Sequence, residues 1–341
     1  MANRPRRRRF SRTLLAALVM ASVAVPLSGA ARPSAVPAPV PPVLAPIRGA
    51  ATPAGLAERY AANREGIRAA ERTAAEHGDR RRATALRALA APERQFLAFD
   101  GRDGGRTAEV FGDLASAERI AVLVPGSDTN LDTYQRFRAG AVSLHEELRE
   151  ELGERAAVVA WLGYRTPATV GPEVLTPGRA EDAAPRLASF LSGLETLRPK
   201  ARVSLLCHSY GSVVCGVAAS GTPAAAMADV SDIVLYGSPG AGVDGAASLR
   251  TKATVWAGRG SGDWIACVPN VSLRLPFADL GLGSNDPVSE EFGARVFAAG
   301  EAGHSDYLKP GSVALTNIAR IVSGRAPSQT QSEAAEENSR A

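Results

Sequence analysis

The sequence predicts an α/β protein in which a mostly parallel sheet of eight strands carries helices on both faces and follows an N-terminal helical segment. Three observations lead to this fold class. Short β-branched apolar runs alternate with helical stretches between Arg94 and Gly324, as in crossovers that join parallel strands. One apolar run passes directly into a helix through a serine. With 22% charged and 45% hydrophobic residues, the composition of the 341-residue chain is that of a soluble globular protein.

The sheet is expected to begin with an antiparallel hairpin at its edge, with arms at Phe96–Asp100 and Glu109–Phe111 around a glycine-rich turn. Six buried runs complete the eight strands, at Ile120–Val124, Ala157–Trp161, Val203–Leu206, Ile233–Tyr236, Thr254–Ala257 and Arg295–Ala298. Helical spacing predicts the crossovers at Leu131–Leu152, Ala184–Leu197, Tyr210–Ser220 and Ser312–Val322.

The first 30 residues have the organisation of a signal peptide. A positive stretch, Arg4–Arg12, precedes the apolar run Leu14–Val25 and the small-residue site Ser28–Ala30. The apolar run is too short to cross about 30 Å of hydrocarbon as a helix, so no stable membrane span is expected after processing, and a retained membrane anchor is the weaker alternative. Because Arg7–Phe10 is also similar to a twin-arginine signal, both this route and the general secretory route fit. The sequence therefore predicts a secreted or cell-envelope protein.

The rest of the chain divides by composition. Residues 31–52 are rich in Pro and Ala and predict a linker. Residues 53–92 predict two helices packed on the main domain, in which we interpret the run Arg80–Arg82 as a solvated face. Residues 93–324 form the predicted main domain, and the polar residues 325–341 predict a disordered tail.

The formal charge of +4 does not indicate a nucleic-acid partner. Six of the 39 basic residues are arginines in the first 12 positions, and the remaining 33 face 35 acidic residues. A slightly acidic chain has no overall electrostatic attraction to phosphate backbones. We therefore expect no nucleic-acid binding.

Three cysteines, Cys207, Cys215 and Cys267, are too few and too odd in number for a disulfide framework. At least one must remain a thiol or pair between chains. Since all three lie in apolar sequence, we interpret them as small buried hydrophobic residues. The sequence contains no CxxC pair, HExxH motif or clustered His/Asp set, so no metal or cofactor is expected.

The most informative segment is Val203–Ser212, a strand that enters a helix through Ser209. It is similar to the nucleophile elbow of the α/β-hydrolases, whose usual form is G-x-S-x-G. Such a serine adopts a strained backbone conformation, and the residues two before and two after it must be small. Gly211 meets this demand, while Cys207 replaces the first glycine and should crowd the turn without abolishing it. The alternative is that Ser209 only caps the helix.

A nucleophilic serine requires a base, and the base requires a carboxylate to orient it. Among the four histidines, His304 follows the last strand and precedes the last helix, where this fold places its base. His208 adjoins the serine, but we expect its side chain to point elsewhere. Asp263, after the next-to-last strand, is the predicted carboxylate, with Asp244 one strand earlier as its rival. Asp263 as a turn or cap residue is the remaining alternative.

Two backbone N–H groups should stabilise the oxyanion that forms during acyl transfer. The residue after the nucleophile, Tyr210, supplies the first. The second is expected from Ser127 in the loop after Ile120–Val124, with Asp128 as the near rival. This loop lacks G-x-G-x-x-G and G-K-[ST], so nucleotide binding is not expected.

The chain resembles a family of largely uncharacterised bacterial α/β-hydrolases that are common among secreted or envelope proteins. The resemblance covers residues 93–324 and implies the α/β-hydrolase fold, a hydrolase activity and the triad Ser209, Asp263 and His304, without an agreed substrate. It rests on ordered segments at Ala121–Gly126, Ala160–Tyr164, His208–Ser212, Tyr236–Gly240, Gly262–Ile265 and Gly303–Ser305.

Together these features predict an exported serine hydrolase, esterase-like or lipase-like, that cleaves a small-molecule or lipid ester through an acyl-enzyme intermediate. The proline-containing segment Gly163–Arg179 is the candidate rim or lid. A peptidase or thioesterase would use the same triad. From another class, a non-catalytic envelope protein would bind its partner through the arginine-rich helices of residues 56–91.

Overall fold

The computed structural model describes residues 36–44, 49–221, 227, 230–270, 272–275 and 278–329. The predicted signal peptide, residues 1–30, and the tail from residue 330 onward lie outside the described residues.

The main sheet contains the eight predicted strands and is parallel except at one edge. Its strands are β1 (Gln95–Asp100), β2 (Arg106–Phe111), β3 (Arg119–Val124), β4 (Ala156–Leu162), β5 (Arg202–His208), β6 (Val230–Tyr236), β7 (Thr254–Gly258) and β10 (Arg295–Val296). They lie in the order β1-β2-β4-β3-β5-β6-β7-β10, and β2 runs antiparallel to both of its neighbours. The predicted fold class, with an antiparallel hairpin at the sheet edge, is confirmed.

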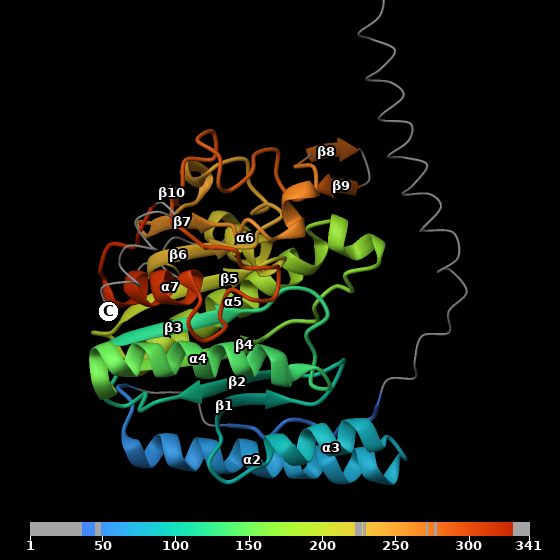
Figure 1. The fold of residues 1–341 in the computed structure, drawn as a ribbon. Coiled ribbons are helices and arrows are strands. Elements are labelled where there is room, and N and C mark those ends of the chain that lie inside the picture. Colours follow the sequence, from blue (N-terminus) through green and yellow to red (C-terminus); the bar gives the residue numbers. More distant parts are fainter. Residues whose placement is uncertain are drawn as a thin grey trace, which may run out of the picture.

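Helices cover both faces of this sheet, as Figure 1 shows. On one face lie α4 (Tyr134–Leu152) and α7 (Val313–Ser323), and on the other α5 (Gly178–Leu197) and α6 (Gly211–Gly221). Because the central strands are covered on both sides, their side chains are almost all buried, which explains the continuous apolar runs. None of the described helices has the length and apolar character needed to cross a membrane.

The last strand is shorter and more exposed than the sequence predicted. Only Arg295 and Val296 pair with β7, and both are exposed, while the buried residues Phe297 and Ala298 follow the strand. A separate two-stranded sheet, β8 (Ser272–Leu275) with β9 (Ala278–Gly281), was not predicted. Its strands have four residues each, too short to show a reliable alternation in sequence.

Among the described residues, two helices precede the sheet, α2 (Pro53–Glu76) and α3 (Arg80–Leu89), and lie beside β1 (Figure 1). The hydroxyl of Thr52 caps α2 by accepting a hydrogen bond from the Gly55 backbone N–H at 3.1 Å. The solvated interpretation of Arg80–Arg82 was wrong for Arg82. This side chain is buried and forms a two-pronged ion pair with Asp132, 2.5 and 3.0 Å long, because α3 packs against the loop that leads into α4.

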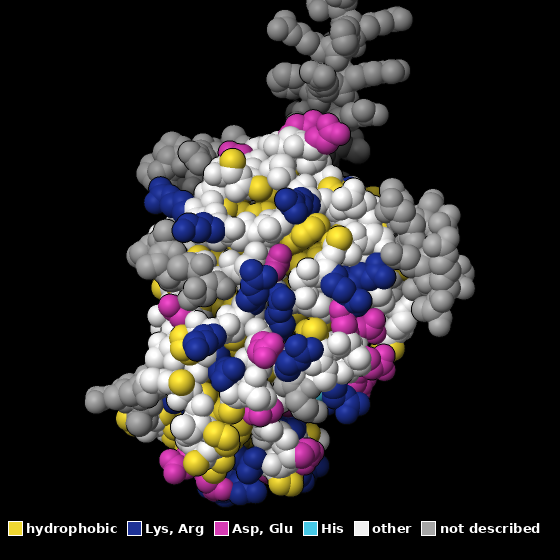
Figure 2. Space-filling view, turned by 90° about the vertical axis from the view of Figure 1, so that its left-hand side faces the viewer, with side chains coloured by type: hydrophobic (Ala, Val, Ile, Leu, Met, Phe, Trp, Pro, Cys, Tyr) yellow, Lys and Arg dark blue, Asp and Glu magenta, His cyan; other side chains and the backbone are white. Residues whose placement is uncertain are grey.

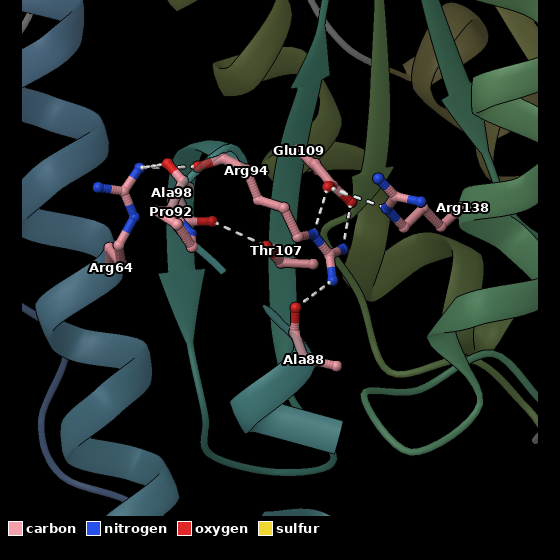
Figure 3. A network of polar contacts seen from close by, with 8 residues as sticks. All are labelled: Arg64, Ala88, Pro92, Arg94, Ala98, Thr107, Glu109 and Arg138. Atoms are coloured by element: carbon pink, nitrogen blue, oxygen red, sulfur yellow. Dashed lines mark hydrogen bonds and ion pairs between the residues drawn. The ribbon is translucent and has the colours of Figure 1, made fainter. Parts of the chain in front are cut away.

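A buried ion pair joins the helical segment to the sheet and to α4 (Figure 3). The guanidinium of Arg94, between α3 and β1, donates to both carboxylate oxygens of Glu109 on β2 at 2.6 Å, and both side chains are almost fully buried. Arg138 of α4 donates to the same carboxylate at 3.3 Å, and Arg94 also donates to the carbonyl of Ala88 in α3 at 2.9 Å. Through Arg94 and Arg138, the Glu109 carboxylate of β2 is linked to both α3 and α4.

The segments at the two ends of the described chain pack onto the domain. The added Cβ of an alanine at Gly66 would lie 3.1 Å from Pro42, so the predicted linker runs closely along α2. At the other end Ser328 is buried, since its N–H donates to the Asn317 side chain and its carbonyl accepts from Ala298, both at 2.9 Å. The prediction of disorder was therefore wrong for the beginning of the tail.

The molecular surface seen from the left side of Figure 1 carries Lys and Arg side chains interspersed with Asp and Glu (Figure 2). No large region of a single charge stands out on this face.

Candidate active site

Ser209 occupies a sharp turn between β5 and α6. Its φ of +53° is a conformation that non-glycine residues rarely adopt. An added Cβ at Gly211 would lie 2.5 Å from the Val124 carbonyl oxygen, and one at Gly126 would lie 2.6 Å from Ser209 Cβ. Both positions therefore require glycine, and the close approach of the two loops brings the Ser209 hydroxyl to the carboxyl end of the sheet. The structure agrees with the predicted elbow.

The three cysteines are not all buried and unpaired, contrary to the sequence-based interpretation. Cys207 and Cys215 are fully buried but form a disulfide across eight residues, and Cys267 is a free, exposed thiol. The sharp turn folds α6 back toward the end of β5, so the two Cα atoms lie 6.5 Å apart. One cysteine thus remains a thiol, but the interpretation of all three as buried hydrophobic residues was wrong.

Three side chains predicted from separate loops converge at the carboxyl edge of the sheet. His304 Nε2 lies 2.9 Å from Ser209 Oγ, and His304 Nδ1 lies 2.9 and 3.1 Å from the two carboxylate oxygens of Asp263. Because a carboxylate only accepts hydrogen bonds, Nδ1 carries the imidazole proton and Nε2 is free to accept the serine proton. The Ser209 hydroxyl is thus directed at the imidazole, and the capping alternative is not favoured.

The carboxylate of Asp263 is held by donors besides the imidazole. It accepts hydrogen bonds from the Tyr307 hydroxyl at 2.6 Å and from the Ile265 N–H at 2.8 Å. Burial by itself would raise the pKa of Asp263, but the hydrogen bonds from His304, Tyr307 and Ile265 outweigh it and lower the pKa below its usual value. Asp263 therefore stays ionised beside the imidazole.

The rival carboxylate is engaged elsewhere. Asp244 accepts hydrogen bonds from the backbone N–H and the hydroxyl of Ser284, at 3.1 and 2.6 Å. It lies on the loop after β6, and these contacts direct its carboxylate to Ser284.

Sequence reasoning missed two further groups. Tyr307, buried three residues after His304, links Asp263 to the Gly260 N–H, from which its hydroxyl accepts at 3.1 Å. The second is His208, which was expected to point elsewhere. Instead, its Nε2 donates to the His304 carbonyl at 2.7 Å, and the two ring centroids lie 5.0 Å apart. The loop that carries His304 folds back over the end of β5, which the local sequence does not reveal.

His208 is uncharged in this position. Its pKa is lowered to about 4, chiefly because burial penalises the charged ring and also because His304 lies beside it. A neutral imidazole still donates one hydrogen bond. His208 can therefore position the backbone of His304 without adding charge to the site.

The backbone N–H groups beside the serine distinguish the two candidates for the oxyanion site. Asp128 N–H donates to the Pro167 carbonyl at 3.0 Å, so it is already engaged. In the described parts of the chain, the N–H groups of Ser127 and Tyr210 have no acceptor. The loop is anchored by the Tyr164 hydroxyl, which donates to the Pro125 carbonyl at 2.6 Å. These two N–H groups are available to a ligand.

A pocket of about 470 Å³ opens beside the nucleophile, and Ser127, Ser209 and His304 are among the residues that line it. The predicted rim, Gly163–Arg179, contributes Thr169 to its lining, and the Thr166 hydroxyl ties the rim to the Thr129 carbonyl at 2.9 Å. The side chains of α4 form another wall. Among the described residues, no group of three or more His, Cys, Asp or Glu side chains is arranged to hold a metal ion.

Comparison with known proteins agrees with this architecture. Residues 100–273 match the protein family described as alpha/beta hydrolase, and the chain belongs to this family. Uncharacterized proteins of Mycobacterium tuberculosis and Mycobacterium bovis are 34% identical over 152 residues, which are 41% of this chain and 54% of theirs. The chain thus spans about half the length of these curated relatives.

Solved structures with a similar fold include two hydrolases. Esterase LipW from Mycobacterium marinum is 16% identical, with 76% of this chain and 88% of that chain covered and a TM-score of 0.42. XC6422 from Xanthomonas campestris, described as an a/b serine hydrolase without lid, is 18% identical, with 68% and 93% covered and a TM-score of 0.41. At these identities and TM-scores the likeness carries no argument about activity or substrate.

Proposed function

We propose that this protein is an exported serine hydrolase that cleaves carboxylic esters, with Ser209 as nucleophile, His304 as base and Asp263 as the carboxylate that orients the base. The observation that carries the proposal is the continuous chain of hydrogen bonds from Ser209 Oγ through the imidazole to Asp263, with lengths of 2.9 Å on either side of the ring. Membership of the alpha/beta hydrolase family supports it.

In the proposed reaction, Ser209 Oγ attacks the ester carbonyl while His304 Nε2 takes the hydroxyl proton. Negative charge passes to the carbonyl oxygen, where the N–H groups of Ser127 and Tyr210 stabilise it. The intermediate collapses, the C–O bond to the alcohol breaks, and the imidazolium returns its proton to the departing alcohol. Water then attacks the acyl-enzyme with His304 again as base, which releases the acid and restores Ser209.

Asp263 lowers the energy of the imidazolium that exists between these proton transfers. Its ionised carboxylate faces Nδ1, and Tyr307 and the Ile265 N–H fix its orientation. The tautomer needed for proton transfer from Ser209 is thereby set before substrate binds.

Export is supported by two independent features. The first 30 residues have the pattern of a signal peptide. The disulfide between Cys207 and Cys215 is of a kind that persists in oxidising compartments and is rare in the cytosol. Fractionation of cells that express the full chain, with detection of processed protein outside the cytoplasm, tests this part of the proposal.

Substitution of the nucleophile tests the chemistry. Ser209→Ala should lower p-nitrophenyl ester hydrolysis by about 10³-fold or more and abolish covalent labelling by a fluorophosphonate, with unchanged circular dichroism. Ser192→Ala, on the exposed side of α5, is the matched control and should retain both. Full activity in the Ser209→Ala protein would overturn the proposal, and failure of folded wild-type protein to label would favour a non-catalytic binding protein.

The leaving group is tested with a substrate panel. The panel contains p-nitrophenyl esters of increasing acyl length, thioesters and peptide anilides. Cleavage by the same triad releases an alcohol, a thiol or an amine, respectively. The ester proposal predicts the highest kcat/KM for an ester. Higher values for the anilides or thioesters would instead identify a peptidase or a thioesterase.

A further inference from the structure

Two of the side chains that line the catalytic pocket are an acid and an arginine, Asp128 and Arg136. Asp128 belongs to the loop after β3, and Arg136 to the first turn of α4. Within the described ranges, Asp128 is hydrogen-bonded to other residues of the protein, whereas Arg136 is not.

Asp128 is engaged by the protein itself. Each of its carboxylate oxygens accepts a hydrogen bond from the Thr169 N–H at 3.2 Å, and its own N–H donates to the Pro167 carbonyl. Asp128 also adopts a φ of +57°. Its contacts hold the rim segment against the loop that carries Ser127, so they account for this acid without a ligand.

Among the residues that the structure describes, no contact explains Arg136 in the same way. It is exposed, and in the described part of the chain it has no hydrogen-bond or ion-pair partner, although Arg138, two residues later, pairs with Glu109. The first turn of α4 contains no acidic residue, and a positive charge there is unfavourable for the helix dipole. Neither an internal ion pair nor helix stability therefore explains a cation that faces the pocket.

The wall beside Arg136 is apolar. Phe137 and Gly140, on the same helix, line the pocket together with Leu308 from the loop after His304. A Cβ added at Gly140 would lie 3.1 Å from Leu308, so this wall is closely packed. The volume of about 470 Å³ is suitable for an ester of modest size. The pocket thus combines an apolar wall with one unpaired positive charge.

We propose that Arg136 selects esters that also carry a carboxylate, which pairs with its guanidinium while the apolar part of the substrate lies against Phe137 and Leu308. A guanidinium binds a carboxylate through two parallel N–H···O bonds, so the pairing also orients the substrate. The inference rests on the proposed function, because it concerns the specificity of the same site.

Two pairs of esters, one matched in carbon chain length and the other in ring skeleton, test the inference. Mono-p-nitrophenyl adipate against p-nitrophenyl hexanoate places the carboxylate on the acyl side, and 4-acetoxybenzoate against 4-acetoxybenzamide places it on the leaving group. The readout is the ratio of kcat/KM for the charged and the neutral member. In at least one pair the wild-type ratio should be about five- to tenfold, and it should decrease when about 0.5 M salt screens the charges.

The variants separate this role from a general loss of activity. Arg136→Gln should bring the ratio of the responding pair to about one, Arg136→Lys should keep part of it, and Arg136→Glu should reverse it. Arg81→Gln, an exposed arginine of α3 outside the pocket lining, is the matched control and should keep the wild-type ratio.

The outcomes are distinguishable. Equal kcat/KM within both pairs for the wild-type protein, or an unchanged ratio in Arg136→Gln, would refute the selection of carboxylates while ester hydrolysis stands. If folded wild-type protein cleaves none of the four esters, the proposed function itself fails, and the selection of carboxylates fails with it.

Discussion

The disulfide that encloses the candidate nucleophile offers a quantitative test. It joins Cys207, two residues before Ser209, to Cys215 in α6, at a sequence separation of eight. Closing a loop of this length removes about 8 cal/mol/K of chain entropy from the unfolded state, equivalent to about 2.5 kcal/mol at 25 °C. The double variant Cys207→Ala/Cys215→Ala should therefore lose at least about 2.5 kcal/mol in the free energy of unfolding, and the lost buried sulfur atoms add to this.

Urea unfolding under non-reducing conditions measures the effect. With an m-value of about 3 kcal/mol/M, the midpoint should fall by about 0.8 M. Cys267→Ala removes the exposed free thiol and serves as the control, with no change in midpoint expected. We also expect lower kcat in the double variant, because the disulfide spans the strained turn at Ser209. An unchanged midpoint in the double variant would refute the reasoning.

Three further predictions concern groups around the site and the N-terminal helices. Tyr307→Phe removes a donor to Asp263, so the pKa of that carboxylate should rise, kcat should fall by about tenfold, and the acid limb of the kcat/KM profile should move to higher pH. Glu109→Gln breaks the buried pair with Arg94 and should cost about 3 to 5 kcal/mol in urea unfolding, whereas replacement of both by apolar residues should cost less. The pKa of His208 is about 4 in the folded protein against 6.5 for a free side chain, so the unfolded chain binds the proton first as the pH decreases. The free energy of unfolding should therefore fall as the pH decreases from 6.5 to about 4, and His208→Gln should flatten this dependence.

Each of these has a contrary outcome. An unmoved acid limb in Tyr307→Phe would assign that hydroxyl to packing alone. A Glu109→Gln midpoint equal to wild type would mean that the buried pair does not hold the helical segment. A slope between pH 4 and 6.5 that survives in His208→Gln would have to come from other groups.

The amino-acid sequence by itself determined the fold class and the candidates for the site. Because helices cover both faces of the sheet, the central strands are continuously apolar, and this pattern can be recognised in the sequence alone. The carboxyl ends of parallel strands meet at one edge, so residues that follow β5, β7 and β10 could be expected near each other. That rule led to Ser209, Asp263 and His304, although their separations reach 95 residues.

Only the tertiary structure decided which side chains support that site. The contact of His208 with the His304 loop, the hydrogen bond from Tyr307 to Asp263 and the pairing of Cys207 with Cys215 all depend on how loops fold back over strand ends. Periodicity reports which face of an element is buried, but it carries no information on the path of a loop. For that reason the sequence identified the groups that the proposed reaction needs, whereas the contacts that orient them became visible only once distant segments were packed together.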